Sequence, residues 1–209
     1  MTAPLAIDLY AGLGGWTEGL LAEGYRVVGF DNVQHVYGEA QYPAQLVLQD
    51  VLTLHGSQFK NAALIVASPP CQAYSYRAMP WKRAKALPPP DNTLFEACFR
   101  IQREACEAAG RHIPLVVENV RGAQKWVGRA RWQFGPYALW GDVPALMPKA
   151  INVQKGKGSG REWWQNNSRT SSKSNERRKW SAMIAKIPLV LARHIAAAWK
   201  PTEKREMAG

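Results

Sequence analysis

The chain of 209 residues contains little cysteine, no long apolar run and fewer acidic than basic residues. Its three cysteines, Cys71, Cys98 and Cys106, are an odd number, which argues against a disulfide framework and leaves room for one reactive thiol. No run of about 18 apolar residues is present, and the sequence does not open with a basic and apolar leader. We therefore expect a cytoplasmic protein without membrane contact, and no metal site, because no cluster of metal ligands is visible.

The excess of basic residues is confined to two segments. The net charge is +11, from 27 Lys and Arg against 16 Asp and Glu. Residues 149–179 carry +7 and residues 77–85 carry +4, so the rest of the chain is neutral overall. This distribution favours a polyanion that is contacted from two places. Solvated basic loops would give the same charge, so charge alone leaves nucleic-acid binding and simple solubility equally open.

The composition predicts one main core with at most a small appendage, since 46% of the residues are hydrophobic and 21% are charged. Between 5 and 120, short apolar runs alternate with helix-like stretches, which is typical of an α/β fold with a mainly parallel sheet. We predict strands at 5–10, 25–31, 45–50, 63–70 and 114–120, and helices at 16–24, 33–42, 93–110 and 188–199. Residues 124–144 favour short strands and loops, and residues 149–179 an extended insert.

A glycine-rich turn follows the first predicted strand. Gly12 and Gly14 would let a ligand approach the backbone and the N-terminus of the next helix. The pattern resembles dinucleotide fingerprints except for Thr17 in place of the last glycine, and a purely structural turn fits it equally well. Asp31 and Asp50 follow the next two strands, where carboxylates would bind the ribose and the adenine amine of a nucleoside cofactor. Helix capping is the alternative role for each acid.

Cys71 and Glu118 lie at two further strand ends. The segment SPPCQ, residues 68–72, fixes the backbone with two prolines before the cysteine, so that its sulfur projects into a cleft. Polar surroundings and a neighbouring basic loop favour the thiolate of Cys71, whereas Cys98 and Cys106 lie on a predicted helix and fit buried, inert thiols. Glu118 belongs to a strand that is otherwise apolar, so it must be paired, protonated or functional.

Together these motifs resemble those of the DNA (cytosine-5)-methyltransferases, in a compact form of bacterial or phage type. DLYAGLGG is similar to the family's cofactor motif, PPCQ to its catalytic motif and ENV to its base-binding motif, in the family's order and spacing. NTLFEACFRI and AKIPLVLARHIA resemble two further motifs, so the likeness covers 5–140 and 181–199. It implies a Rossmann-like methyltransferase fold, with a catalytic domain at 1–140, a small basic recognition insert at 141–180 and a C-terminal helix at 181–209 that returns to the catalytic domain.

The resemblance implies methyl transfer from S-adenosylmethionine to carbon-5 of a flipped-out cytosine in double-stranded DNA. Cys71 would attack carbon-6 as a thiolate, and Glu118 would bind ring N3 and the exocyclic amine. The cofactor-binding residues that the resemblance implies are Tyr10, Gly12, Gly14, Asp31, Asp50, Pro69 and Phe95. Core packing is the alternative for Phe95 and for its neighbour Leu94.

Two departures from the family pattern leave residue roles open. The Gln-x-Arg-x-Arg stretch that follows the ENV strand in the family is missing, and Arg129, Arg131 and Arg121 are rival candidates for its catalytic, base-contacting arginine. The Gly-Asn pair of the C-terminal motif is replaced by Ala185-Lys186, and Lys186 would either approach the cofactor carboxylate or remain a surface cation. A catalytically impaired DNA-binding relative is therefore an alternative, although the intact catalytic motifs argue against it.

Both basic segments would hold the DNA. The loop 73–90 would close over the flipped base, with Tyr74 among the side chains that could fill the vacated stack. The predicted DNA contacts are Ser75, Arg77, Trp81, Lys82, Arg83, Lys155, Lys157, Arg161 and Arg169. A recognition insert of about 40 residues predicts a short or relaxed target sequence, and the compact chain is compatible with a monomer. An RNA cytosine-5 methyltransferase of the same fold is the remaining alternative, since basic loops bind either polymer.

Overall fold

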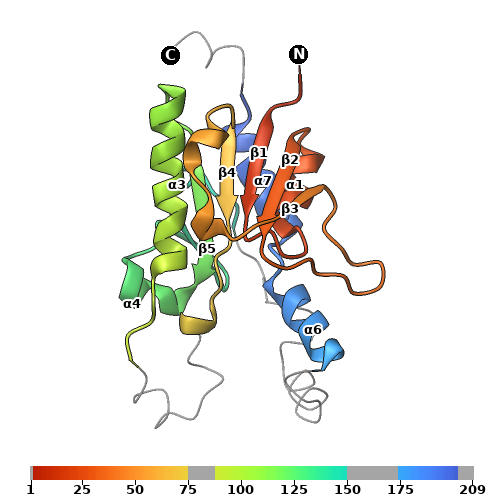
Figure 1. Ribbon diagram of the computed structural model, residues 1–209. Helices are drawn as coiled ribbons and strands as arrows, with labels where there is room; N and C mark the ends of the chain where they lie inside the picture. Colours follow the sequence, from red (N-terminus) through yellow and green to blue (C-terminus); the bar gives the residue numbers. More distant parts are fainter. Residues whose placement is uncertain (1, 75–87, 150–173, 202–209) are drawn as a thin grey trace.

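The computed structural model describes residues 2–74, 88–149 and 174–201 and is built around a seven-stranded sheet (Figure 1). The strands are β1 (Leu5–Leu9), β2 (Arg26–Asp31), β3 (Gln45–Leu48), β4 (Leu64–Ala67), β5 (Leu115–Val120), β6 (Trp132–Phe134) and β7 (Tyr137–Gly141). Their order across the sheet is β3-β2-β1-β4-β5-β7-β6. Strands β1 to β5 run parallel, and β7 runs antiparallel to both β5 and β6. The carboxyl ends of β1 to β5 therefore meet at one edge of the sheet.

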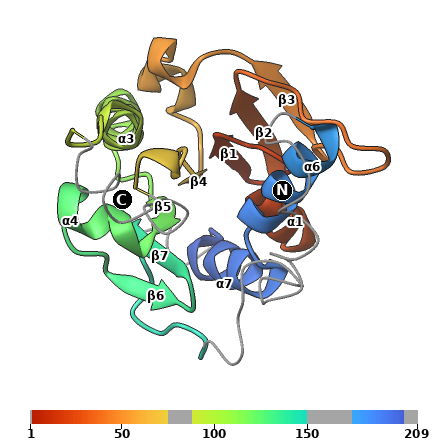
Figure 2. The same ribbon diagram turned by 90° about the horizontal axis from the view of Figure 1, so that it is seen from below.

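Helices cover both faces of the sheet (Figure 2). The helices are α1 (Gly15–Ala22), α3 (Thr93–Ala109), α4 (Gln124–Val127), α6 (Asn175–Ala185) and α7 (Leu189–Trp199), with 3-10 turns η1 (Val51–Thr53), η2 (Gly56–Phe59), η3 (Gln72–Tyr74) and η5 (Arg121–Ala123). Helices α1 and α7 pack together on one face, and α3 lies on the other. An added Cβ at Gly19 of α1 would lie 2.4 Å from the Cβ of Ala192 in α7, so glycine permits this close contact.

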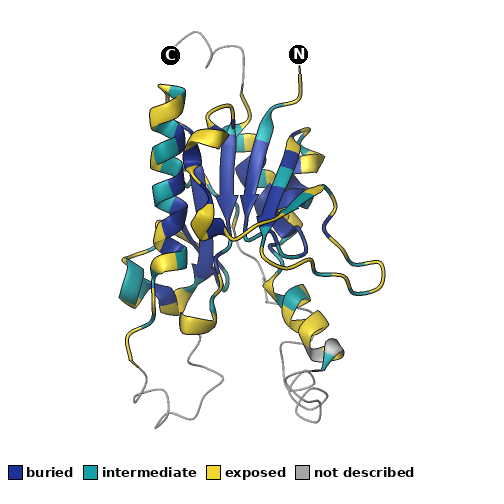
Figure 3. Ribbon diagram, viewed as in Figure 1, coloured by how far each residue is buried: buried dark blue, intermediate teal, exposed yellow. Residues whose placement is uncertain are grey.

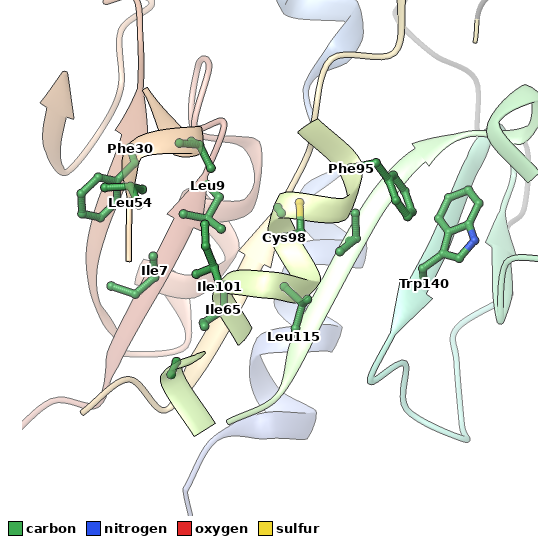
Figure 4. Close-up of a cluster of buried hydrophobic side chains, with 14 of the residues drawn as sticks. Ile7, Leu9, Phe30, Leu54, Ile65, Phe95, Cys98, Ile101, Leu115 and Trp140 are labelled. Atoms are coloured by element: carbon green, nitrogen blue, oxygen red, sulfur yellow. The ribbon is translucent and has the colours of Figure 1, made fainter. Parts of the chain in front are cut away.

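Successive residues of the central strands face opposite helices. Ile7, Leu9 and Ile65 pack toward α3, as Figure 4 shows. Ala6 and Leu64 pack on the other side, with α1 and α7. Both faces of these strands are thus buried (Figure 3), which explains their nearly continuous apolar sequences. Each fully buried Leu or Ile side chain contributes about 1.5–3 kcal/mol to folding.

The predicted α/β fold with a mostly parallel sheet is confirmed, and all five strands expected before residue 120 are present. The predicted helix at 33–42 is wrong. Residues 32–44 form a loop that contains an isolated bridge between Tyr37 and Ala40. Gly38 adopts a left-handed φ of 65°, and Pro43 disfavours helical backbone at the preceding residue. Both features prevent a helix here.

The prediction of an extended insert at 149–179 is wrong for its last residues, because α6 begins at Asn175. This helix crosses the domain boundary that we expected at residue 180, and the other domain boundaries stay predictions. It extends beyond the carboxyl edge of the sheet (Figure 1). Within the described residues, no single helix could cross a membrane by length and apolar composition; Arg178–Ala185 and Leu189–Trp199 meet that test only as a pair, bent by 42°.

Candidate active site

A cavity of about 770 Å³ opens at the carboxyl edge of the sheet, within the range of about 300–1,000 Å³ that is usual for small-molecule sites. Its lining residues are Tyr10, Ala11, Gly12, Leu13, Gly15, Trp16, Asp31, Asn32, Val33, Gln34, His35, Val36, Tyr37, Asp50, Val51, Ser68, Pro70, Gln72, Leu94, Arg178, Ser181, Ala182, Ala185, Lys186 and Ile187. We call the lining residues within 10–16 and 68–72 the sheet wall, and those within 178–187 the helix wall.

The glycine turn after β1 presents open backbone to this cavity. Tyr10 and Gly12 both have left-handed backbone, with φ values of 60° and 52°, and the Tyr10 hydroxyl donates to the carbonyl of Leu94 at 2.8 Å. A Cβ added at Gly12 would meet no heavy atom closer than 4.0 Å, so a ligand has access there. Gly14 serves packing instead, because its added Cβ would lie 2.4 Å from Cδ of Pro43. Gly14 does not line the cavity.

A buried polar network supports this turn from below. The Thr17 hydroxyl donates to Oδ2 of Asp8 at 2.6 Å and lies 2.6 Å from the hydroxyl of Tyr42. Because the Thr17 proton is used on Asp8, Tyr42 must donate to Thr17. Burial, with a smaller contribution from the charge of Asp31, raises the pKa of the Asp8 carboxyl from 3.8 to about 8. Thr17 thus replaces the expected glycine with a hydrogen-bond donor for a buried acid.

Asp31 and Asp50 both line the cavity and also cap local backbone. Asp31 accepts hydrogen bonds from the backbone N–H of Gly12 at 2.9 Å and of Val33 at 3.1 Å. Asp50 caps η1 by accepting from the N–H of Leu52 at 2.9 Å. Backbone capping and cofactor binding, the two alternative roles of these acids, are therefore compatible. Capping fixes each carboxylate at the cavity and leaves lone pairs that can accept further hydrogen bonds.

The turn that bears Cys71 is held on both sides. Trp16 Nε1 donates to the Ser68 hydroxyl at 2.9 Å, and the side-chain amide of Asn119 donates to the carbonyl of Pro69 at 2.9 Å. Cys71 is half-buried, and the residues on both sides of it line the cavity. The two prolines and these two hydrogen bonds thus fix the backbone where the thiol projects.

The other two cysteines lie away from this turn. Cys98 is fully buried on α3, and burial raises the pKa of its thiol, which keeps it protonated. Cys106 is half-buried, and its sulfur accepts from the N–H of Ile113 at 3.1 Å. The expectation of inert packing is confirmed for Cys98, whereas Cys106 is less buried than expected.

Glu118 is buried on β5, with 5% of its surface exposed. Because β4 and β5 pair in parallel through Ala67 and Val117, Glu118 and the Cys71 turn both lie at the carboxyl ends of neighbouring strands. Glu118 is directly opposite Leu139 of β7. Burial, and then the charge of Glu118, raise the pKa of the Tyr137 hydroxyl, which donates to the carbonyl of Lys186 at 3.1 Å.

Several residues predicted for the cofactor lie outside the cavity. Phe95 is buried in the core, with its ring 5.3 Å from that of Trp140, and its neighbour Leu94 lines the cavity instead. Core packing is therefore the correct alternative for Phe95. Pro69 is buried, and Pro70 lines the cavity in its place.

The three candidate arginines occupy different places. Arg129 and Arg131 are exposed, and Nη1 of Arg131 donates to the carbonyl of Gly141 at 3.5 Å. Gly141 is opposite Val116, near the amino end of β5, so the structure does not bring Arg131 to the cavity. Arg121 is exposed on η5, directly after β5. The next residue, Gly122, lies so close to η3 that an added Cβ would be 2.4 Å from the carbonyl oxygen of Tyr74.

Tyr74 is not available for the vacated base stack. It is buried, and its hydroxyl donates to the side-chain oxygen of Asn92 at 2.9 Å. The hydrogen bond to the start of α3 makes it a structural anchor. The remaining predicted DNA contacts lie outside the described residues; they are Ser75, Arg77, Trp81, Lys82, Arg83, Lys155, Lys157, Arg161 and Arg169.

Two parts of the cavity were missed by sequence reasoning. The segment 32–37, where we expected a helix, forms one part of the lining, and Arg178, Ser181, Ala182 and Ala185 form another from one face of α6. The spacing of these α6 residues, at three and four positions, is helical. However, no apolar stripe marks this face, so the sequence contained no signal for it.

The sheet order, the reversed strand β7 and the cavity at the parallel edge define a Rossmann-like α/β fold of the class that S-adenosylmethionine-dependent methyltransferases have. The lining fits this cofactor, because an open glycine turn is flanked by carboxylates at the ends of β2 and β3. The sequence profile of the C-5 cytosine-specific DNA methylases matches residues 5–127, and the chain belongs to this family.

Solved structures with partial likeness include other methyltransferases. One is a putative DNA modification methyltransferase encoded within a prophage of E. coli, with 25% identity, a TM-score of 0.42, and coverage of 60% of this chain and 34% of that chain. Another is the Dnmt2 methyltransferase of S. pombe, with 17% identity, a TM-score of 0.38, and coverage of 59% and 36%. The likeness thus spans about a third of each of these proteins. No curated protein matches the chain in sequence.

Proposed function

We propose that the chain transfers a methyl group from S-adenosylmethionine to carbon-5 of a flipped-out cytosine in double-stranded DNA. The observation that supports this most is that the Cys71 turn and Glu118 lie at the carboxyl ends of neighbouring strands, and that the residues on both sides of Cys71 line the cavity. A half-buried thiol on a fixed turn and a buried carboxyl group are the two groups that this reaction needs from the protein.

Carbon-5 of cytosine is a poor nucleophile, so the reaction begins at carbon-6. The Cys71 thiolate forms a bond to carbon-6, while Glu118 binds ring N3 and the exocyclic amine and relieves the charge that develops on the ring. S-adenosylmethionine supplies an electrophilic methyl group on its sulfonium. As carbon-5 takes this methyl, the methyl–sulfonium bond would break and S-adenosylhomocysteine would leave. Carbon-5 would then lose its proton to water, and the electrons of that C–H bond would expel the Cys71 sulfur and restore the aromatic ring.

The neighbouring residues position these groups. Ser68 and Asn119 hold the turn before Cys71 through Trp16 and the Pro69 carbonyl, and the carboxylates of Asp31 and Asp50 bind the nucleoside part of the cofactor. Among the three arginines, the position of Arg121 beside η3 favours it as the base contact over Arg129 and Arg131. The two basic segments bind the DNA backbone.

Transfer of labelled methyl groups tests the proposal directly. The protein is incubated with S-adenosylmethionine and duplex DNA, RNA or no polymer, and Cys71→Ser is compared with Cys106→Ser as the matched control. We expect label in DNA for the unchanged protein and for Cys106→Ser, whose hydroxyl can keep the hydrogen bond from Ile113. Cys71→Ser should lose at least about 100-fold in rate.

Each other outcome has a defined meaning. Transfer to DNA that survives Cys71→Ser would exclude the covalent route. Label in RNA rather than in DNA would mean that RNA, and not DNA, is the substrate. No transfer by any variant, with DNA binding retained, would favour the catalytically impaired relative.

A further inference from the structure

We propose that Lys186 binds the carboxylate of the amino-acid part of the cofactor and exchanges its partner Glu18 for it. The inference rests on the proposed function in one respect, namely that the main cavity holds S-adenosylmethionine. It adds a specificity-determining residue that lies outside the sheet wall, in the link between α6 and α7.

The position of Lys186 points to this role. The residue lines the main cavity and also a second one of about 550 Å³, so it lies between the two. A Cβ added at Gly15 would lie 2.9 Å from Cγ of Lys186, so the lysine stem lies against the first turn of α1. About 25% of its side chain is exposed, which leaves the ammonium group partly screened from solvent.

The ion pair of Lys186 with Glu18 can be exchanged. Nζ of Lys186 contacts Oε1 of Glu18, which lies in the first turn of α1 and has 40% of its side chain exposed. An ion pair with so much solvent access contributes little to stability. A second carboxylate that enters from the main cavity can therefore compete with Glu18 at small cost.

Charge complementarity sets the direction of the cofactor. Asp31 and Asp50, at the ends of β2 and β3, form the acidic end of the cavity and suit the hydroxyl and amine groups of the nucleoside. Lys186 lies at the N-terminus of α1, which has a positive partial charge. The only anionic group of S-adenosylmethionine is its carboxylate, so it belongs at this end. Arg178, the other strong cation of the lining, is exposed on α6 and less suited to fix one group.

Ligands with and without the amino-acid part separate this role from a general effect on the cavity. S-adenosylmethionine carries the carboxylate, whereas 5′-methylthioadenosine keeps the nucleoside and lacks the amino acid. Dissociation constants of both ligands are measured by calorimetry for the unchanged protein, Lys186→Met, Lys186→Arg and Glu18→Gln. Lys60→Met, an exposed lysine at the end of η2, is the matched control.

We expect Lys186→Met to weaken S-adenosylmethionine about tenfold, the effect of one charge-assisted hydrogen bond, and to change 5′-methylthioadenosine less than about twofold. Lys186→Arg should retain most of the affinity. Glu18→Gln removes the competitor and should leave the affinity unchanged or higher. Lys60→Met should bind both ligands normally.

Three results would overturn the inference. Equal weakening of both ligands by Lys186→Met would mean that the lysine only shapes the cavity, and no weakening would mean that it is a surface cation. A loss in Glu18→Gln as large as in Lys186→Met would mean that the ion pair merely joins α1 to the helix wall. If the unchanged protein binds neither ligand, the proposed function itself fails.

Discussion

The sheet wall and the helix wall of the cavity are built in different ways. Hydrogen bonds from buried side chains hold the sheet wall. Trp16 donates to Ser68, Asn119 to the carbonyl of Pro69, and Thr17 to Asp8. In α6, by contrast, no side chain that the structure describes is buried (Figure 3). The helix wall is anchored to the core only at its end, where Ile187 is buried and the carbonyl of Lys186 accepts a hydrogen bond from the Tyr137 hydroxyl.

This difference matches the demands on each wall. Reacting groups must be held closely in the productive geometry, so the turn before Cys71 is fixed by several independent constraints. A wall that only completes a binding cavity tolerates movement, because its contacts add affinity without aligning the reacting atoms. Changes that loosen the Cys71 turn of the sheet wall should therefore affect the rate of methyl transfer, and changes in the helix wall should affect affinity alone.

Among the changes that test this difference between the walls, the largest effect is expected from Asn119→Ala, which removes the hydrogen bond to the Pro69 carbonyl in a buried site. We expect the rate of methyl transfer to fall about 10- to 100-fold, because the Cys71 turn loses one constraint. The free energy of unfolding should fall by about 1–3 kcal/mol, the cost of an unsatisfied buried acceptor. The affinity for S-adenosylmethionine should stay within about twofold.

Asn61→Ala is the control for this change, since Asn61 is exposed in a turn away from the cavity. It should alter neither rate nor stability. If Asn119→Ala lowered affinity as much as rate, Asn119 would support the cavity as a whole and not the Cys71 turn, and the contrast between the walls would weaken.

The next effect concerns pH and the buried acid behind the sheet wall. The pKa of Asp8 is raised to about 8, so the folded protein holds a proton that the unfolded chain releases near pH 3.8. The folded state thus binds more protons between these values, and the contribution of Asp8 to stability falls as pH rises from about 4 to about 8. Asp8→Asn imitates the protonated acid and should remove this contribution.

Denaturant unfolding at pH 6 and pH 9 measures the difference. We expect the unchanged protein to lose more stability between these values than Asp8→Asn does. Asp91→Asn, at an exposed position, should behave like the unchanged protein over this range. Equal losses in Asp8→Asn and in the unchanged protein would show that Asp8 is ionised in the fold.

Asp8 also marks the limit of sequence reasoning for the sheet wall. The strands, the glycine turn and the Cys71 turn were predictable because apolar runs and short motifs are local. The hydrogen bonds of Thr17 with Asp8 and Tyr42 join three separate segments, so the sequence presented Thr17 only as a missing glycine. Long-range polar contacts of this kind depend on how β1, α1 and the following loop pack together.

The sequence also did not show which side of a helix faces the cavity. Neighbouring residues on α3 differ by about 100° in direction, so Leu94 reaches the cavity while Phe95 enters the core. The position of Arg131 was hidden for a similar reason. The side chain follows the β6–β7 hairpin to the carbonyl of Gly141, and this direction keeps it from the cavity. The part of the helix wall that α6 forms was missed because α6 buries no apolar face that a periodic pattern could reveal.

The smallest effect is expected in that wall, from Ala182→Leu. Ala182 is half-buried on α6 and lines the cavity, so three added carbons would occupy space that the cofactor needs. We expect affinity for S-adenosylmethionine to fall several-fold, while the free energy of unfolding changes by less than about 0.5 kcal/mol because no core packing is disturbed. Ala108→Leu, at an exposed site on α3, is the matched control and should bind normally. With saturating cofactor, the rate of methyl transfer by Ala182→Leu should return to that of the unchanged protein. A rate that stays low at saturation would mean that the helix wall also aligns the reacting groups, and the division of labour between the two walls would then be lost.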